Sequence, residues 1–523
     1  MPALTIQQAF HLAGRHYDAG RFREAESLYR QILSHNPAHS DSLRMLALLA
    51  HQFGRKSVAL ELLRRAIEIN PGVWDYHSNL GVLLAAAGRQ DEAIIAFRNG
   101  LALRPNDPEI YSNLGGALLQ QELGDEAIAA FARALELRPD FPEAHYNLGN
   151  ALCQAKHFED AARHYQSALS LRPTYVEAHF NLANVYRRTN RLPEAIDAYR
   201  HSLALRPQYA EARWNLALAL LCKGEYVQGF VEYESRRQIS DLWRGRGFSQ
   251  PQWDGGELAG QTILLWDEQG LGDTIQFVRY ASLVSDRGGR VLLRCKQELK
   301  RLLAKQCDIS GAYSEDEPLP SFDVQCPLGT LPMIFGTTID TVPATVPYLA
   351  ADSILAAHWG AKFSPIQSGL KVGLAWAGGT AHPDDKTRSL PLAALAPLAQ
   401  VEGAVYYSLQ LGEAARQIPT APAGLHLIDW TAELSDFADT AALIENLDLV
   451  IACDTSVAHL AGAMGKPAWV LIPFAPDWRW MLDRSDSPWY SSIRLFRQLP
   501  PWDWEHLVHQ VALELQARSR PAV

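Results

Sequence analysis

Small and apolar side chains return at a fixed interval through the first half of the chain. Alanine recurs every 34 residues, and Gly229 takes its place in a closing unit: Ala25, Ala59, Ala93, Ala127, Ala161 and Ala195. An aromatic side chain keeps the same interval, with Leu63 as the exception: Tyr29, Phe97, Phe131, Tyr165, Tyr199 and Tyr233. Small residues let two helices approach closely, and aromatic rings fill the space between neighbouring helix pairs. The pattern predicts about seven helical hairpins over residues 1–240.

Proline marks where one hairpin should end and the next begin. It also recurs every 34 residues: Pro37, Pro71, Pro105, Pro139, Pro173 and Pro207. Because a proline ring clashes with the preceding helical turn, these positions cannot be helix interiors. A 34-residue helical hairpin is typical of the tetratricopeptide repeat (TPR). We therefore predict an α-solenoid, wound as a right-handed superhelix, whose concave face holds another macromolecule.

One polar position follows the same interval. Asparagine stands five times before a leucine and then a glycine or alanine: Asn79, Asn113, Asn147, Asn181 and Asn215. An asparagine amide has donors and an acceptor that match a peptide unit, so such a row could hold an extended polypeptide by its backbone. Alternatively, each asparagine ties one hairpin to the next. The array resembles the TPR superhelix of the O-linked N-acetylglucosamine transferases over about residues 37–240, and that resemblance implies polypeptide binding by the five asparagines.

The pattern changes in the second half, where short apolar runs alternate with helical stretches. The expected strands are Thr262–Trp266, Arg290–Arg294, Lys371–Ala375, Val405–Leu409, Asp448–Ile451 and Ala468–Ile472, and helices are expected over Thr274–Ser285 and Ser456–Met464. This alternation predicts doubly wound parallel sheets. We expect a junction over 241–258 in which Trp243 and Trp253 pack, lobes over 259–352 and 366–498, and a C-terminal helix over 499–523.

Composition narrows the class of protein. A chain of 523 residues exceeds one hydrophobic core, and 48% hydrophobic with 20% charged residues is typical of a folded protein. A net charge of −10 without a basic stripe argues against a nucleic-acid partner. The six cysteines lack CxxC spacing, so we expect reduced thiols. With no basic-then-apolar N-terminus and no apolar run near the roughly 20 residues of a membrane span, we expect a cytoplasmic protein.

The first segment with chemical potential is WDEQGLGDTI, over residues 266–275. Its glycines allow a tight turn from a strand into a helix, and a helix N-terminus favours an anion. The segment is neither the GxGxxG of a dinucleotide site nor a P-loop, which needs a lysine. Asp273 lies at the carboxyl end of a strand, where open sheets bind ligands. The residue is either a helix cap or a catalytic group.

The second segment, WAGGTAHPDDKTRS, follows the strand that ends at Ala375. Lys386 and Arg388 come after small residues and could clamp a diphosphate, since both cations neutralise oxyanions. The alternative is a solvated polar loop. Asp384 and Asp385 are adjacent and not spaced as Asp-x-Asp, so no metal site is expected.

The third segment, VIACDTSVAHLAGAMGKP, starts at Val450. A strand ends at Asp454, and Thr455 and Ser456 open a helix whose first N–H groups would receive a phosphate. Asp454 could bind sugar hydroxyls. His459 lies one turn into this helix and is either a packed histidine or an acid/base group.

Together the three segments resemble the heptosyltransferase-like glycosyltransferases (glycosyltransferase family 9), and more closely their TPR-fused bacterial members. The resemblance covers about residues 258–498, chiefly through EQGLGDTIQFVRY and DTSVAHLAGAMGKP. It implies a GT-B fold of two Rossmann-like lobes, with Asp273 as the base. The nucleotide-sugar site would comprise Gly272, Thr380, Lys386, Arg388, Gln410, Asp454, Thr455, Ser456 and His459.

These expectations combine into one functional hypothesis. It is the metal-independent, inverting transfer of a sugar from a nucleotide donor to a hydroxyl of a polypeptide in the TPR groove, with no cofactor besides the donor. The polypeptide could be flagellin or another bacterial protein, with a nonulosonic acid delivered from CMP. Because the resembling family acts on lipopolysaccharide cores, a lipopolysaccharide-type acceptor stays open. The alternative is a non-catalytic TPR adaptor with a degenerate transferase fold, and homo-oligomerisation through the repeats is a further option.

Overall fold

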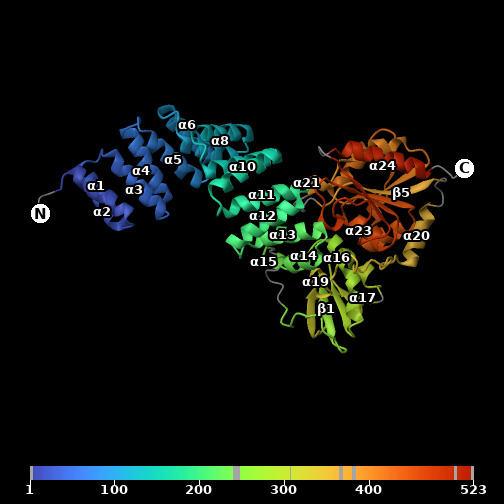
Figure 1. Ribbon diagram of the computed structural model, residues 1–523. Helices are drawn as coiled ribbons and strands as arrows, with labels where there is room; N and C mark the ends of the chain where they lie inside the picture. Colours follow the sequence, from blue (N-terminus) through green and yellow to red (C-terminus); the bar gives the residue numbers. More distant parts are fainter. Residues whose placement is uncertain are drawn as a thin grey trace. The chain divides into compact units, whose positions relative to one another are not determined.

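The computed structural model describes residues 4–239, 248–306, 308–363, 369–379, 385–499 and 503–519 (Figure 1). The chain divides into two compact units, Met1–Tyr186 and Arg187–Val523. From residue 4 onward, the secondary structure of the first unit consists of helices alone, whereas the second unit contains the last helical hairpins and two β-sheets. No helix among the described residues is both long and apolar enough to cross a membrane.

Helices of the first unit form pairs in which the first member has 13 residues and the second 14. They are α1 (Ile6–Asp18), α2 (Phe22–His35), α3 (Ser40–Gln52), α4 (Lys56–Ile69), α5 (Trp74–Ala86), α6 (Gln90–Leu103), α7 (Pro108–Gln120), α8 (Gly124–Leu137), α9 (Pro142–Gln154), α10 (Phe158–Leu171) and α11 (Val176–Arg188). The recurring alanines and aromatic residues are buried, as Ala127 and Phe131 illustrate. The predicted helical solenoid is confirmed.

Glycine and proline shape each hairpin. A Cβ atom on Gly115 would lie 2.8 Å from the ring of Phe131, so only glycine lets α7 pack this closely on α8. Gly81 lies similarly close to the ring of Phe97, and Gly149 to the ring of Tyr165. Each second helix ends two residues before a recurring proline; α8 ends at Leu137, ahead of Pro139. The proline therefore marks the break between hairpins, as predicted.

The second unit begins with the end of the repeat pattern. Its first helices are α12 (Leu192–Leu205), α13 (Ala210–Lys223), the shorter α14 (Tyr226–Tyr233) and α15 (Arg236–Ile239). Of the predicted junction, residues 241–247, including Trp243, lie outside the described part. Trp253 is buried and packs on Phe335 of the following lobe, with ring centroids 5.9 Å apart.

The first sheet has four parallel strands in the order β3-β2-β1-β4. Its elements are β1 (Thr262–Trp266), α16 (Leu271–Phe277), η2 (Val278–Tyr280), α17 (Ala281–Ser285), β2 (Arg290–Arg294), α18 (Gln297–Leu303), β3 (Gly311–Tyr313), β4 (Val324–Pro327), η3 (Leu328–Thr330) and α19 (Leu331–Ile334). The single helix expected over Thr274–Ser285 is wrong, because a 3-10 turn interrupts it. The three residues of that turn, from Val278 to Tyr280, are buried.

The second sheet has six strands in the order β10-β9-β8-β5-β6-β7, and all neighbouring strands run parallel. Its elements are α20 (Ser353–Phe363), β5 (Leu370–Ala375), α21 (Asp385–Arg388), η4 (Leu392–Gln400), β6 (Ala404–Ser408), η5 (Glu413–Thr420), β7 (Leu427–Ile428), η6 (Thr431–Glu433), α22 (Phe437–Glu445), β8 (Leu449–Cys453), α23 (Ser456–Ala463), β9 (Ala468–Ile472), η7 (Trp478–Trp480), β10 (Ile493–Arg497) and α24 (Trp504–Ser519). Apolar residues of α24 pack with Val372 and Leu374 of β5 in one core cluster. The predicted parallel sheets are confirmed.

Strand order locates the edges at which ligands bind. Sequence order reverses between β5 and β8 in the second sheet, and between β1 and β4 in the first. In open α/β sheets, the crevice outside the carboxyl ends of the strands at such a reversal is where ligands bind. Each sheet therefore offers one such edge, and the sequence segments singled out above follow β1, β5 and β8.

The described cysteines are all free, and all but Cys153 are buried. Burial raises the pKa of the Cys295 thiol to about 12, so this side chain stays protonated near neutral pH. Cys307 lies outside the described residues.

Candidate functional site

Thr455 begins α23 directly after β8. Its backbone is extended, with φ −139° and ψ 167°, and its carbonyl accepts the N–H of Ala458 at 3.0 Å. A threonine at this position usually caps the helix with its hydroxyl. Here the hydroxyl makes no cap, and the buried Oγ1 has no hydrogen-bond partner within the described part of the chain. Since the first N–H groups of a helix lack internal partners, this turn presents unused polar groups for a ligand.

Asp454 precedes Thr455 and is almost completely buried. Burial raises the pKa of its carboxyl to about 6, and the nearby carboxylate of Asp477 adds to this rise. Such a pKa makes Asp454 an acceptor above about pH 6 and a donor below it.

His459 lies one turn into α23. Burial holds the pKa of its imidazole well below the ordinary value, and the positive charge of Arg479 contributes in the same direction. The ring is therefore neutral, and its 3.9 Å approach to Asp454 is not an ion pair. His459 Nδ1 lies 2.8 Å from the Tyr490 hydroxyl, and the ring stacks on Trp480. These contacts favour the packed-histidine alternative.

Gln410 holds the loop after β5. Its Oε1 accepts the N–H groups of Trp376 (2.9 Å) and Ala377 (2.8 Å), and its Nε2 donates to the carbonyls of Ala377 and Leu411. The amide is thus fully engaged with backbone. Gln410 therefore shapes the loop and has no free donor for a ligand.

Two basic residues of the predicted clamp lie on the short helix α21. Arg388 is half-buried, and a Cβ atom on Gly378 would lie 2.5 Å from its Nη2, so the guanidinium rests directly on this glycine. Lys386 is exposed. Thr380 and Asp384 lie outside the described residues. The place of Thr380 in the nucleotide-sugar site therefore stays a prediction.

Asp273 lies in the first turn of α16. One carboxylate oxygen accepts the N–H of Gly270 at 2.8 Å. Gly270 is the N-cap of α16, so Asp273 is not the N-cap considered from the sequence but the third helical residue, which reaches back to that cap. The other oxygen accepts a hydrogen bond from Arg479 and forms an ion pair with it. Each carboxylate oxygen has two lone pairs, so both retain one site for a further proton or donor.

Arg479 was not recognised from the sequence. Its buried guanidinium binds Asp273, the carboxylate of Asp477 at 2.9 Å and the side chain of Gln276, and it stacks on the ring of Trp478. Although burial opposes it, the two carboxylates together raise the pKa of Arg479. A single arginine between two tryptophans has no spacing signal that would have indicated this role.

Gly272 brings the two candidate regions together. A Cβ atom at this position would lie 2.8 Å from Cδ2 of His459, so α16 packs directly on α23. Asp273 is the next residue in the chain, and Thr455 opens the helix that carries His459. The segment after β1 and the segment after β8 are therefore in contact, with Arg479 beside Asp273.

The asparagine ladder is mixed. In the first unit, Asn181 donates to Asn150 (2.9 Å) and to the hydroxyl of Tyr146 (3.1 Å), so it ties α11 to α9. Asn79 bonds within its own helix to Asp75, and Asn215 is half-buried in the second unit. Asn113 is exposed and Asn147 half-buried, and neither amide has a hydrogen bond to the described residues. The alternative in which asparagine ties one hairpin to the next is therefore observed at Asn181. The amides of Asn113 and Asn147 are available to bind a polypeptide.

Comparison with known proteins identifies the first half. Residues 12–73, 146–210 and 180–238 match the tetratricopeptide repeat family, and residues 83–122 and 125–156 match the TPR repeat. Residues 12–238 are a tetratricopeptide repeat array. The matches to the TPR family cover the helical hairpins and do not extend into the two sheets.

One curated relative extends beyond the TPR array. Protein FlbA of Caulobacter vibrioides is 28% identical over 326 residues, which cover 57% of this chain and 54% of that protein. The chain thus spans about half the length of this relative. Because residues 1–240 are less than half of the chain, the alignment reaches into the second half.

Solved structures similar to this chain include a TPR protein and two proteins described as a pilus factor and as pilF. YrrB, described as a TPR protein with an unusual peptide-binding site, is 18% identical, covering 35% of this chain and 95% of YrrB with a TM-score of 0.31. PilW, a type IV pilus biogenesis factor, is 20% identical with coverage of 40% and 96% and a TM-score of 0.38. The pilF protein of Pseudomonas aeruginosa is 22% identical, and the match covers 39% of this chain and 92% of pilF with a TM-score of 0.36.

Proposed function

We propose that this chain is a glycosyltransferase of GT-B layout that transfers a sugar from a nucleotide donor to a hydroxyl of a polypeptide held by the TPR array. The observation that carries the proposal is the contact of Gly272 with His459. Through it, the carboxylate of Asp273 lies next to the helix α23, whose first turn has an unpartnered buried hydroxyl. A candidate base beside an anion-binding helix start is what transfer from a sugar diphosphate requires.

The charge distribution supports an anionic donor. The arginines that lower the pKa of His459 are Arg479, Arg279 and Arg388. Arg279 is buried, and its partners in the described chain are three backbone carbonyls and the hydroxyl of Tyr348, without a carboxylate. Its positive charge is therefore not neutralised by an ion pair. A diphosphate at the start of α23 would compensate this excess and be bound by Thr455 and Arg388.

In the proposed reaction, the acceptor oxygen forms a bond to the anomeric carbon while the bond from that carbon to the diphosphate oxygen breaks. The electron pair leaves with the diphosphate, and the acceptor proton moves to Asp273. A carboxylate is a weak base toward an alcohol, so proton transfer accompanies bond formation. Attack opposite the leaving group inverts the configuration, through an oxocarbenium-like transition state. Arg388 and the α23 start stabilise the departing charge.

The TPR array would supply the acceptor. Asn113 and Asn147, whose amides are available, would hold the backbone of an extended polypeptide, while Asn181 maintains the stacking of hairpins. Holding the acceptor in this way raises its local concentration near the transferase lobes. Flagellin or another bacterial protein remains the proposed acceptor class, and the alignment of FlbA with both halves of this chain supports treating the halves as one functional protein.

Equilibrium donor binding tests this function. We expect one of UDP, GDP, ADP and CMP, or the corresponding nucleotide sugar, to raise the melting temperature. At a ligand concentration of about 100 times Kd, binding adds about 2.7 kcal/mol to the free energy of unfolding. Arg388→Ala and Lys386→Ala should lose this rise. Arg416→Ala is the matched control, since it removes an exposed arginine from η5 of the same lobe. A rise in all variants alike would place the nucleotide elsewhere and contradict the proposed site.

The second candidate function is a non-catalytic TPR adaptor. The contacts of Asp273 within the protein support it. Capping Gly270 and pairing with Arg479 give this carboxylate a structural role that needs no chemistry. The adaptor predicts polypeptide binding by the array with no effect of any nucleotide on melting. Absence of a nucleotide effect in the screen, together with retained polypeptide binding, would decide for the adaptor.

A further inference from the structure

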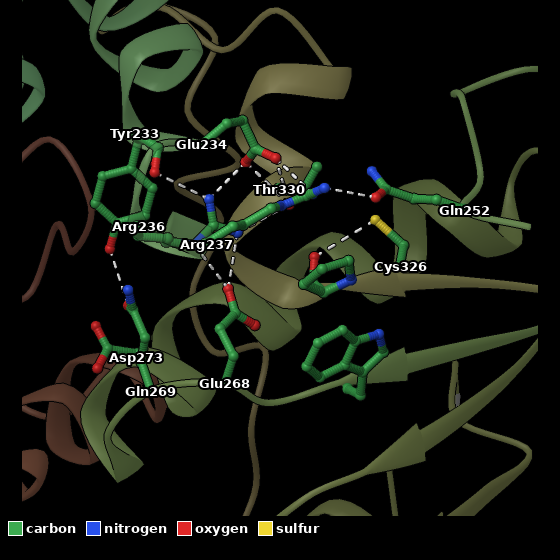
Figure 2. A network of polar contacts seen from close by, with 12 residues as sticks. Tyr233, Glu234, Arg236, Arg237, Gln252, Glu268, Gln269, Asp273, Cys326 and Thr330 are labelled. Atoms are coloured by element: carbon green, nitrogen blue, oxygen red, sulfur yellow. Dashed lines mark hydrogen bonds and ion pairs between the residues drawn. The ribbon is translucent and has the colours of Figure 1, made fainter. Parts of the chain in front are cut away.

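The ligand-binding edge of the first sheet is occupied by the protein itself. The strand order reverses between β1 and β4, so a ligand would be expected where these strands end. Arg236 of α15 lies there instead, and only 3% of the side chain is exposed. Its guanidinium donates to Glu268 after β1, at 2.9 and 3.1 Å, and to the Thr330 hydroxyl after β4, at 2.8 Å (Figure 2).

The surroundings of Arg236 balance its charge. Glu234 accepts from Arg236 at 2.5 Å and pairs with Arg237 at 2.5 Å, so two carboxylates face two guanidinium groups (Figure 2). Burial raises the pKa of Glu268, and the charge of Arg236 opposes that rise. A Cβ atom on Gly329 would lie 2.6 Å from Oε1 of Glu268, so the backbone is shaped to admit this carboxylate. This cluster of ion pairs and hydrogen bonds therefore connects the last hairpin to the first sheet.

Tyr233, the last residue of α14, makes a second connection. Its hydroxyl donates to the side chain of Gln269 at 2.8 Å (Figure 2). Lys296 donates to the backbone carbonyl of the same residue at 2.5 Å. Gln269 lies four residues before Asp273. The ring of Tyr233 also packs on Trp478, the neighbour of Arg479. Tyr233 therefore contacts the segments that carry both members of the Asp273–Arg479 pair.

The hydroxyl of Tyr233 is not needed for the repeat. The same repeat position holds phenylalanine at Phe97 and Phe131, where the ring alone is buried between helices. A phenylalanine at position 233 should thus keep the packing of α14 and remove only the hydrogen bond to Gln269.

We propose that Tyr233 and Arg236 are positioning residues through which the last TPR hairpin sets the geometry of the segment Glu268–Asp273. The consequence for catalysis rests on the proposed function, in which Asp273 is the base. The structural consequence does not depend on the proposed function. The Arg236 guanidinium fills the ligand-binding edge of the first sheet, and the last TPR hairpin holds the loop after β1 through hydrogen bonds. In this arrangement the nucleotide binds to the second lobe only.

Hydrogen exchange of the full-length protein tests the structural part. We expect Tyr233→Phe to raise backbone exchange over residues 267–277 about fivefold, the effect of losing one hydrogen bond. Tyr29→Phe is the matched control, because it makes the same change at the same repeat position in the first hairpin. Gln269→Leu should give the same increase, and the double variant should add nothing to it. Unchanged exchange in Tyr233→Phe, or an equal increase in the Tyr29→Phe control, would overturn the proposal.

Kinetics test the catalytic part once the nucleotide screen has identified a donor. We expect Tyr233→Phe to lower kcat about tenfold while KM for the donor and nucleotide binding stay unchanged, because the base is displaced and the donor site is not. An unchanged kcat would contradict the positioning role. If no donor binds at all, the proposed function fails, and the exchange result still decides whether the last hairpin holds the loop.

Discussion

The carboxylate of Asp273 is paired with the guanidinium of Arg479, which lies 206 residues farther along the chain. Asp273 belongs to the segment after β1 of the first sheet, and Arg479 to the segment after β9 of the second. The same guanidinium also binds Asp477 and Gln276. One buried cation therefore joins the two sheets at the point where the proposed base lies.

Loss of this cation should be costly for the second unit. Arg479→Ala leaves Asp273 and Asp477 without their partner, and we expect the free energy of unfolding to fall by about 3 kcal/mol. Urea denaturation followed by tryptophan fluorescence is suited to the test, since every tryptophan except Trp74 lies in this unit. Arg484→Ala, which breaks a more exposed pair with Asp486, should cost less than about 1 kcal/mol. Equal losses in both variants would contradict the importance of the buried pair.

The raised pKa of Asp454 predicts a pH dependence of stability. The folded-state pKa of about 6 exceeds the unfolded value of about 3.9, so between them the folded state binds a proton that the unfolded state has lost. Stability from this group is present below the unfolded pKa and is lost as pH rises through about 6. Relative to Asp454→Asn, the wild type should lose about 1.4 kcal/mol between about pH 5 and about pH 8. A constant difference between the two proteins in urea denaturation would show that Asp454 is not perturbed.

Two adjacent glycines in α7 should respond in opposite directions. Gly115→Ala forces a methyl group against the ring of Phe131, and we expect a loss of about 1–3 kcal/mol. Gly116→Ala points into open space and should gain about 0.5–1 kcal/mol from helix propensity. Thermal denaturation followed by far-ultraviolet circular dichroism compares them directly. Shifts of the same sign would be inconsistent with this packing.

The asparagine ladder should divide into structural and binding members. Asn181→Ala loses hydrogen bonds to Asn150 and Tyr146 and should lower the free energy of unfolding by about 1 kcal/mol. The double variant Asn113→Ala with Asn147→Ala should change stability by less than about 0.5 kcal/mol and lose affinity for extended polypeptide. Denaturation and binding to an array of synthetic unstructured peptides measure the two effects. Peptide binding at the wild-type level in the folded double variant would remove the ladder from the proposed function.

Much of the fold could be predicted because its signals are local. The 34-residue period specifies the same buried environment in each hairpin, so alanine and aromatic positions such as Ala127 and Phe131 follow directly. Strands with unbroken apolar runs, β1, β2 and β9, were predicted at their observed bounds. The strand β4 was not predicted because its four residues include a glutamine and a proline, and β7 is too short for any periodicity. The strand β10 was also missed, because its sequence IRLFR neither alternates strictly nor forms an unbroken apolar run.

The site was predictable only where a motif carries it. The glycine-rich turn at Asp273 and the Asp-Thr-Ser start of α23 indicated a ligand site from their sequence alone, and the structure brings them into contact at Gly272 and His459. Arg479 and Arg236 have partners that are distant in sequence, so no spacing could reveal them. Tyr233 was missed for a different reason: the repeat period already explained an aromatic residue there, which concealed the separate role of its hydroxyl.

The boundary between the compact units lies at Tyr186, inside α11 and well before the repeats end. Hairpins of a solenoid contact only their neighbours, so whole 34-residue units can be inserted or deleted ahead of this helix without altering the core of the second unit. The helices α12–α14 cannot be exchanged in this way, because they share that unit with both sheets. A lineage, or a designed chimera, can therefore change the number and surface of the upstream repeats while the core of the second unit stays constant.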